Sequence, residues 1–430
     1  MIRMRLIMVA AVLAWATVTE AGAKGAFGDW FADSTLRIDY QFGGDGVEQW
    51  VMLDKMMKSD GWAGKRKHLD ESPLGGNGSL TVTDKATGDT LYVTTFSSLF
   101  HEWLATEEAQ SVKRAMGNTF LVPLPKSEAV ITIAILNNRH ERVAELSHIY
   151  RPDDELVRRQ DSESLPFRYI HKGGEPEEAI DVAILGEGYT AEEMDSFYLY
   201  AEKAVEAILN HEPFMSMADK FNFVAVASPS KESGVSIPRL GDWKETAFNS
   251  HFSTFYSDRY LTTDRLFDVH DALKGIPYEH IIIIANTDEY GGGGIYNSYV
   301  MTTAKHKMMA PVIVHEFGHS FGGLGDEYFY PDDEMSNLYP TDVEPWEPNL
   351  TTLTNFGSKW GHLLAPGTPV PTPAEKAGDW ETGVFEGGGY SFTGVYRPAD
   401  ECRMRNNTYP TFCKACDDWL RRLIKFYTEE

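Results

Sequence analysis

The sequence predicts an α+β protein, in which an N-terminal β-sandwich precedes an α/β domain. Two observations carry this prediction. Up to residue 150, apolar residues recur in short β-branched runs separated by turn residues, and helix signals are weak. From residue 167 onward, short apolar runs alternate with helical patterns, which is typical of α/β domains. The segment 151–166 is charged and poor in apolar residues, so we expect it to be a linker between a domain at 24–150 and a domain at 167–430.

Length and charge limit the class of protein. A chain of 430 residues is long enough for two domains, and 42% hydrophobic and 24% charged residues are usual for globular proteins. The formal net charge of −25 argues against nucleic acid or an anionic membrane as a partner, because phosphate binding requires basic patches.

Residues 1–23 are typical of a secretory signal peptide. Arg3 and Arg5 precede an apolar core at 6–15, and Ala21-Gly22-Ala23 forms an A-x-A cleavage site. The apolar core is too short to span a bilayer, and no other stretch approaches eighteen apolar residues. We therefore expect cleavage near Ala23, export to the periplasm, cell surface or medium, and a mature protein that does not span the membrane.

The N-terminal part contains recognisable strand patterns. The segment Thr35–Tyr40 alternates with period two, and the runs at 80–83 and 91–94 flank the polar stretch Asp84–Asp89, which suits a hairpin. Ala129–Leu136 is a further β-branched run, and Glu102–Arg114 is the only helix pattern in this part. No catalytic constellation is recognisable here, so we expect a binding or packing role.

The C-terminal part reads as alternating strands and helices. Thr190 and Glu193 form a capping box, which predicts a helix that runs to about Asn210. The remaining predicted elements are strands at 180–185, 221–227, 280–285 and 295–302, and helices at 263–273 and 417–427.

A run of four glycines, Gly291–Gly294, precedes the predicted strand at 295–302. A phosphate loop is disfavoured, because no Lys-Ser/Thr follows and the run does not open a helix. We interpret the run as flexible backbone beside a cleft. The following strand is then an edge strand that can pair with an extended peptide through main-chain hydrogen bonds.

The stretch His315–Tyr328, HEFGHSFGGLGDEY, contains an H-E-x-x-H pattern. Residues four apart lie on one face of a helix, so His315 and His319 can bind one metal ion together. Glu316 lies at the edge of that face and is placed to act as general base on a water whose pKa zinc lowers to roughly 7. A solvated surface helix is disfavoured because the preceding residues 308–314 are apolar.

The residues after this helix provide a candidate third ligand. Gly322 and Gly323 predict a helix stop, and two carboxylates, Asp326 and Glu327, follow at once. A catalytic zinc site usually has three protein ligands, and Asp326 is the first side chain after the turn that can bind zinc. Glu327 is the alternative ligand, or else a partner that orients a ligand histidine.

This stretch resembles the active-site signature of the IgA-protease-type zinc metallopeptidases, which are metzincin-like. In the pattern H-E-x-x-H-x-x-G-x-x-H/D, Gly322 occupies the glycine position, Gly325 occupies the third-ligand position, and the acid comes one residue later at Asp326. The resemblance covers most of residues 165–430. It implies a metzincin-like zinc peptidase domain, with a β-rich accessory domain before it. Met404, in Cys402-Arg403-Met404-Arg405, resembles the methionine of a Met-turn.

The three cysteines, Cys402, Cys413 and Cys416, lie near the end of the chain. In an exported protein a disulfide from Cys402 to Cys413 or Cys416 is expected. A zinc or redox role for the C-x-x-C pair is disfavoured, because only one further cysteine lies nearby and no βαβ pattern surrounds the pair.

The segment 329–400 offers weaker signals. The acidic residues at 331–334 could bind a structural calcium ion, but a solvated loop is the preferred interpretation. Three tyrosines could donate a phenol to an oxyanion, although packing is the default for each of Tyr390, Tyr396 and Tyr409. The tryptophans Trp346, Trp360 and Trp380 are also expected to pack.

The function that these features favour is an exported zinc endopeptidase. His315, His319 and Asp326 would bind Zn²⁺, and Glu316 would take the proton from the attacking water and pass it to the leaving amine. The alternatives are a zinc hydrolase of non-peptide amides and a surface-binding protein with a residual metal site. Specificity for immunoglobulin A is not implied, because the chain has only one small accessory domain.

Overall fold

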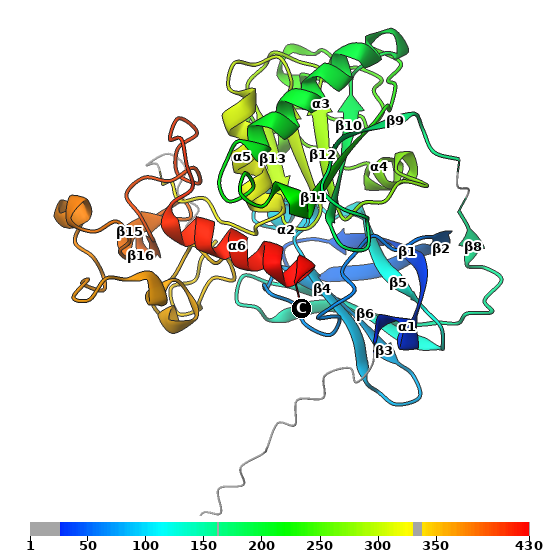
Figure 1. Ribbon diagram of the computed structural model, residues 1–430, viewed down its shortest axis with the longest axis horizontal. Coiled ribbons are helices and arrows are strands. Elements are labelled where there is room, and N and C mark those ends of the chain that lie inside the picture. The colour runs from blue at the N-terminus through cyan, green and yellow to red at the C-terminus, as the bar shows by residue number, and fades with distance from the viewer. Residues whose placement is uncertain (1–25, 161–162, 330–337, 430) are drawn as a thin grey trace, which may run out of the picture.

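The computed structural model describes residues 26–160, 163–329 and 338–429 (Figure 1). The expected signal peptide and the candidate calcium loop at 331–334 lie outside these residues. The described chain is mixed α/β, with a β-rich N-terminal part, two four-stranded sheets, one six-stranded sheet and one two-stranded sheet. No helix in these three stretches is both long enough and apolar enough to cross a bilayer.

The N-terminal part consists of two sheets, with strand orders β5-β1-β2-β8 and β4-β3-β6-β7. Aromatic rings join them, since Phe96 lies 5.8 Å from Phe42 and 4.4 Å from Phe120, centroid to centroid. After the short helix α1 (Phe27–Trp30), the strands are β1 (Phe31–Gly44), β2 (Gln49–Asp60), β3 (Gly78–Asp84), β4 (Thr90–Phe96), β5 (Arg114–Pro125), β6 (Ala129–Leu136), β7 (Arg142–Tyr150) and β8 (Arg158–Arg159).

Most strand predictions for this part are confirmed. Strands β3 and β4 form the predicted hairpin, β6 has the predicted bounds, and β1 contains the predicted strand at 35–40. The predicted helix at 102–114 is wrong. Helix α2 (Leu99–Leu104) starts earlier, because the Ser98 side chain caps it by accepting the His101 amide, and β5 already begins at Arg114.

The C-terminal part is built on a six-stranded sheet of order β13-β14-β12-β10-β11-β9. Its four central strands are parallel, and both edge strands are antiparallel to their neighbours. The strands are β9 (Phe167–Lys172), β10 (Ile180–Glu187), β11 (Phe221–Val226), β12 (His280–Ala285), β13 (Gly292–Ile295) and β14 (Tyr299–Thr303). The central strands are buried along their whole length, which explains their continuous apolar runs.

The helices of this part agree with the sequence patterns. They are α3 (Met194–Leu209), α4 (Leu266–Ala272), α5 (Met309–Ser320) and α6 (Lys414–Thr428). The predicted capping box is present, because the Glu193 carboxylate accepts the Thr190 amide at 2.9 Å at the turn that leads into α3. Pro311 lies in the first turn of α5, where its missing N–H leaves no intrahelical bond unmade.

The glycine run corrects one expectation. Instead of a flexible segment before a strand at 295–302, the glycines themselves form the edge strand β13, and a turn separates β13 from β14. A Cβ at Gly294 would lie 2.3 Å from the carbonyl oxygen of Glu316 in α5. Only glycine therefore allows this edge strand to lie directly against α5.

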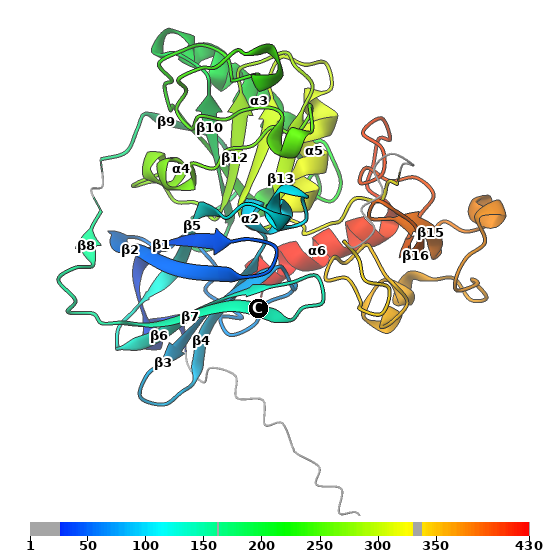
Figure 2. The same ribbon diagram turned by 180° about the vertical axis from the view of Figure 1, so that it is seen from behind.

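The large sheet is covered on both faces. Residues such as Leu185 and Ile283 belong to a buried cluster that also contains the core of the N-terminal sheets. Their neighbours Ile184 and Ile282 belong to a second cluster, formed with α3, α5 and α6. Because successive side chains of a strand point to opposite faces, the sheet lies between the N-terminal part and a layer of helices (Figure 2).

A buried charge network lies where the two parts meet. The Arg37 side chain in β1 pairs with Asp39 at 2.8 Å and with Asp271 of α4 at 2.5 Å, and it donates to the carbonyl of Phe267 at 3.1 Å. The segment 151–166 carries β8, which extends the first N-terminal sheet by pairing with β2.

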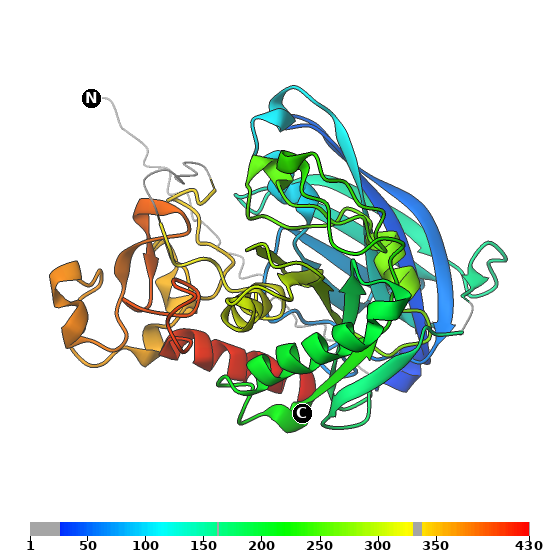
Figure 3. The same ribbon diagram turned by 90° about the horizontal axis from the view of Figure 1, so that it is seen from above.

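Residues 338–413 form a separate, loop-rich lobe beside the end of α5 (Figure 3). It contains the two-stranded sheet of β15 (Phe385–Gly388) and β16 (Ser391–Arg397). Helix α6 then runs from this lobe back toward the N-terminal sheets (Figure 1).

Candidate active site

The two histidines of the H-E-x-x-H pattern converge on one point. The Nε2 atoms of His315 and His319 lie 3.0 Å apart. His315 Nδ1 donates to the carbonyl of Arg403 at 2.9 Å, and His319 Nδ1 donates to the carbonyl of Leu324 at 2.6 Å. Because a carbonyl can only accept, each Nδ1 carries a proton, and Nε2 is the ring nitrogen that each histidine can offer to a metal ion once it is deprotonated.

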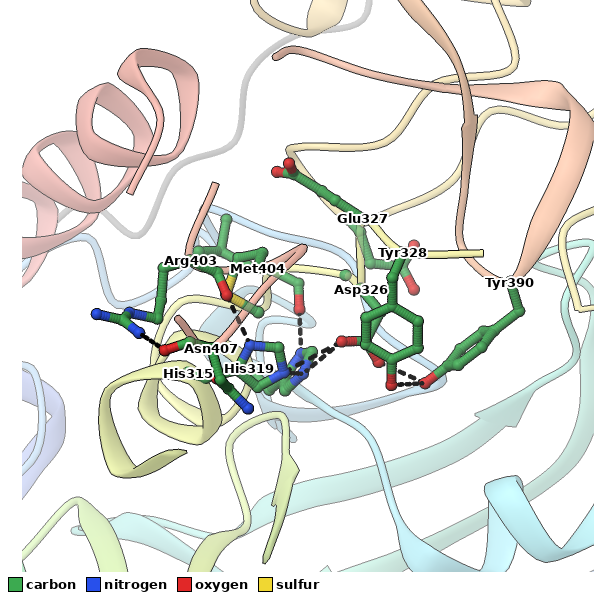
Figure 4. A network of polar contacts seen from close by, with 12 residues as sticks. His315, His319, Asp326, Glu327, Tyr328, Tyr390, Arg403, Met404 and Asn407 are labelled. Carbon is green, nitrogen blue, oxygen red and sulfur yellow. Dashed lines mark hydrogen bonds and ion pairs between the residues drawn. The ribbon is translucent and has the colours of Figure 1, made fainter. Parts of the chain in front are cut away.

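Asp326 completes a triangle with these two atoms (Figure 4). Its Oδ1 lies 3.1 Å from His315 Nε2 and 3.3 Å from His319 Nε2. Ligand atoms about 2.0–2.1 Å from a tetrahedral zinc ion are about 3.3 Å apart, so the three atoms fit one face of such a site. Asp326 Oδ1 is also buried without a hydrogen-bond partner, which a metal ion would supply.

A glycine turn brings Asp326 to this position. Gly323 adopts a left-handed φ of +59°, and the Leu324 amide closes the helix end by donating to the Gly318 carbonyl at 3.1 Å. The side chain of Asn349 then holds both the amide and the carbonyl of Gly325, at 2.8 and 2.9 Å. Asn349 was not identified from the sequence, because no local pattern connects it with this turn.

Glu327 lies elsewhere. Its carboxylate points away from the two histidines, accepts a hydrogen bond from Asn349 at 2.9 Å and lies 3.2 Å from the sulfur of Cys416 (Figure 4). The structure therefore brings Asp326 to the histidines, and Glu327 to the cysteines.

Met404 lies beneath the two histidines. A Cβ at Gly318 of α5 would be 2.8 Å from the Met404 sulfur, so the glycine between His315 and His319 makes room for this side chain. The carbonyl of Met404 accepts the Glu327 amide at 2.9 Å. The turn at 402–405 thus contacts His315, helix α5 at Gly318, and the segment that carries Asp326.

Tyr390 contacts the acidic member of the triangle. Its hydroxyl donates to Asp326 Oδ2 and lies 3.3 Å from the hydroxyl of Tyr328. Tyr390 therefore does more than pack. Tyr396 and Tyr409 do not line the same cavity.

The charges at this point attract a cation. Burial alone would raise the pKa of Asp326, but His319 and His315 hold that pKa well below its ordinary value. Burial alone would lower the pKa of His319, but Asp326 and Glu316 raise it to about 9. Burial also raises the pKa of Glu316, against the pull of both histidines. The donor atoms of His315, Glu316 and His319 lie within 4.8 Å of one another, and Asp326 Oδ1 lies 3.1 Å from His315 Nε2, so these groups could hold one metal ion.

Comparison with models of protein families shows which family the chain belongs to. A family model described as IgA Peptidase M64 matches residues 169–382, and one described as Peptidase M64 N-terminus matches residues 26–147. The chain belongs to the IgA peptidase M64 family. No curated protein matches the chain. Membership makes this M64 protein a peptidase, a hydrolase that acts on protein or peptide substrates, and this bears out the resemblance seen in the sequence.

The candidate centre of the M64 peptidase lies in a cavity of about 920 Å³. Strand β13 and helix α5 form its floor, with the 338–347 segment and Tyr390 on one side. The N-terminal part forms another wall, through α2 and the residues that follow it. This wall was not predicted from the sequence, where the N-terminal part showed no site residues.

Glu102 of α2 is the most notable residue of this wall. The hydroxyl of Tyr260 donates to its carboxylate, and burial raises the pKa of Glu102 to about 7 despite that hydrogen bond. Its field reaches Glu316, His319 and Asp326. The M64 N-terminal part therefore contributes directly to the electrostatics of the cleft.

The expected disulfide is not formed in the structure. All three cysteines are free and buried, and the sulfurs of Cys402 and Cys416 lie 3.8 Å apart, whereas a disulfide bond is about 2.05 Å long. The physical reason is that Cys413 and Glu327 join the same cluster, so four groups surround one point instead of two sulfurs facing each other.

Proposed function

We propose that this peptidase is an exported, zinc-dependent endopeptidase whose domain at 167–430 is metzincin-like. One observation carries the proposal: His315 Nε2, His319 Nε2 and Asp326 Oδ1 form a triangle with sides of 3.0–3.3 Å in the cleft of about 920 Å³. Asp326 is then the third ligand, one residue beyond the position that the usual pattern gives to it.

Zinc bound at this point would polarise the peptide carbonyl and lower the pKa of a bound water to about 7. The protein's own residues prepare the site for it. The carbonyls of Arg403 and Leu324 fix both imidazole rings, and Tyr390 holds the free oxygen of the Asp326 carboxylate. These contacts orient the three ligands before any substrate binds.

Glu316 acts as the general base. It follows His315 on α5, lines the cleft, and lies within ligand distance of both histidines. Its carboxylate takes a proton from the attacking water and passes it to the nitrogen of the departing amine. Burial raises the pKa of Glu316, which makes its carboxylate a stronger base than an exposed one.

The metzincin-like assignment rests on the order of the parts around α5. A parallel sheet with an antiparallel edge strand precedes α5, a glycine turn follows it, and Met404 lies beneath the histidines. In this interpretation the turn at 402–405 is the Met-turn. Residues 24–150 form the accessory domain, and 151–166 form the linker.

An extended peptide is the substrate that suits the cleft. Strand β13 is the edge of its sheet and lines the cavity, so its outer backbone groups face the substrate. The segment at Tyr260 already pairs with this edge at Gly292, which leaves the remainder of the strand for a peptide. Export is part of the proposal because residues 1–23 have the pattern of a signal peptide.

Profiling with a diverse peptide library tests this function. The mature protein should cleave internal peptide bonds, lose activity with a chelator and regain it with zinc. His319→Ala serves as the matched variant, since it removes a proposed ligand on the same helix. Cleavage that persists in a chelator, or in His319→Ala, would rule out the proposed centre.

A further inference from the structure

A second cluster of metal-binding side chains lies on the far side of Asp326. It consists of Glu327, Cys402, Cys413 and Cys416, which are all buried and whose ligand atoms lie within 4.8 Å of one another. The four residues come from three segments: the irregular segment after the glycine turn, the turn that carries Met404, and the start of α6. None of them takes part in the proposed hydrolysis.

The distances within the cluster fit a tetrahedral metal ion. Two thiolates, each about 2.3 Å from zinc, are about 3.8 Å apart at the tetrahedral angle. The sulfurs of Cys402 and Cys416 are 3.8 Å apart. A thiolate and a carboxylate oxygen on the same ion would be about 3.5 Å apart, and Cys416 Sγ lies 3.2 Å from Glu327 Oε1.

The backbone around the cluster favours thiolates. The amides of Cys413 and Met404 point at the sulfur of Cys402, at 3.2 and 3.5 Å. Cys413 is the N-cap of the fifteen-residue helix α6, so it lies at the positive end of the helix dipole. A helix N-terminus and convergent N–H groups stabilise negative charge on sulfur, as metal binding requires.

Glu327 supplies independent evidence that this cluster can bind a cation. The residue is 0% exposed, and its Oε2 atom is buried without any hydrogen-bond partner. A buried carboxylate among sulfur atoms is costly unless a cation or a proton neutralises it, and a metal ion held by the sulfurs would also contact the unpaired Oε2. Four anionic ligands carry more negative charge than one divalent ion can neutralise. Two buried guanidinium groups, those of Arg397 and Arg403, interact with Glu327 and Cys402 and offset the remaining negative charge.

We propose that Glu327, Cys402, Cys413 and Cys416 bind a second, structural zinc ion. Thiolate-rich tetrahedral sites select zinc, and a site with four protein ligands has no open position for substrate. The ion joins the start of α6 to both sides of the candidate active site. Glu327 follows Asp326 directly, and Cys402 precedes Arg403, whose carbonyl orients His315.

This inference goes beyond the proposed hydrolysis and can be tested apart from it. Elemental analysis of the full mature chain should find about two zinc ions per chain, one for each site. Cys416→Ser and His319→Ala should each retain about one. The matched pair separates the sites, because each variant removes one ligand from one cluster only.

Cobalt substitution tests whether the cysteine sulfurs bind a metal ion. The proposed catalytic ligands contain no sulfur, so thiolate-to-cobalt charge-transfer absorption in the near ultraviolet reports the cysteine cluster alone. We expect this absorption in the wild type and in His319→Ala, and its loss in Cys416→Ser. A wild-type protein with the absorption but without hydrolysis would refute the catalytic proposal and leave the structural site intact.

If Cys416→Ser does not fold, the reactivity of the cysteine thiols in the wild-type protein tests the same site. The three cysteines should resist alkylation in the native metal-loaded protein and react after chelation. Mass spectrometry that finds a disulfide between any two of them would overturn the proposal. So would reactive native thiols in a protein that carries only one zinc ion.

Discussion

Asp326 and Glu327 are adjacent in the chain, yet their carboxylates belong to different clusters. Asp326 Oδ1 lies 3.1 Å from His315 Nε2 (Figure 4), whereas Glu327 Oε1 lies 3.2 Å from the sulfur of Cys416. One short extended segment therefore connects the candidate catalytic centre with the cysteine cluster, and substitutions at the two positions should have different effects.

Asp326→Ala should lose the catalytic metal and keep the cysteine site. Removal of a direct ligand should weaken metal binding by more than the roughly 10–100-fold that is typical for partners behind the ligands. Hydrolysis measured against increasing chelator gives the affinity. Glu327→Gln is the control, which should instead reduce the cobalt–thiolate absorption. Normal metal dependence in Asp326→Ala would reverse the ligand assignment.

Glu316→Gln should bind metal and fail to hydrolyse peptides. The amide preserves the shape of the side chain but cannot take a proton, and loss of a general base reduces turnover by roughly 10²–10⁴-fold. Turnover and zinc content are measured on the same preparation. An active Glu316→Gln enzyme would remove this residue from the mechanism.

Tyr390→Phe should weaken metal binding at the catalytic centre by roughly 10–100-fold, because Asp326 loses the hydroxyl that holds its second oxygen. Chelator competition provides the measurement. Tyr396→Phe is the matched control, since Tyr396 does not line the cleft and should leave the affinity unchanged. Equal effects of the two substitutions would assign Tyr390 to packing alone.

Gly294→Ala should destabilise the protein and reduce its activity. The new Cβ would lie 2.3 Å from the carbonyl oxygen of Glu316, so β13 must move away from α5. Overpacking of this kind costs about 1–3 kcal/mol, measured as a loss in the free energy of unfolding. Gly357→Ala, where nothing lies within 4 Å of the added Cβ, should behave like the wild type.

Arg37→Ala should destabilise the contact between the N-terminal part and the large sheet. Asp39 is 0% exposed and would keep a buried charge without its main partner, which costs about 3–5 kcal/mol. Arg139→Ala is the control, because the Arg139–Asp342 pair is exposed and solvent screens such pairs, so its loss should leave the stability close to that of the wild type. Denaturant unfolding of both variants makes the comparison, and equal losses would contradict the role of Arg37.

The sequence predicted those helices and strands that are determined by a few neighbouring residues. The capping box at Thr190, the apolar strands β10 and β12, and the helix that carries His315 and His319 all follow from spacing alone. Strand β2 was missed because its Met and Lys residues do not alternate cleanly, and it is ordered by pairing with β1. The prediction of a helix at 102–114 was wrong because the chain from Arg114 onward forms β5, which is ordered by pairing with the distant strand β1.

The site was predictable to the same extent. The two histidines and the carboxylates near them could be identified because they all lie in the short stretch 315–327. Asn349 and Glu102 could not, since each comes from a distant segment and has no motif of its own, and no pattern distinguished Tyr390 from the other candidate tyrosines. The strand formed by the glycine run was not predicted. The glycines allow this strand to lie close against α5, and that helix comes later in the chain.

The contact between His315 and Arg403 spans 88 residues of chain. During translation the H-E-x-x-H helix leaves the ribosome well before the carbonyl that orients its first histidine exists. A nascent chain that ends before residue 403 also lacks the methionine beneath the two rings. The candidate active site therefore cannot assemble in full until the C-terminal segment has been synthesised.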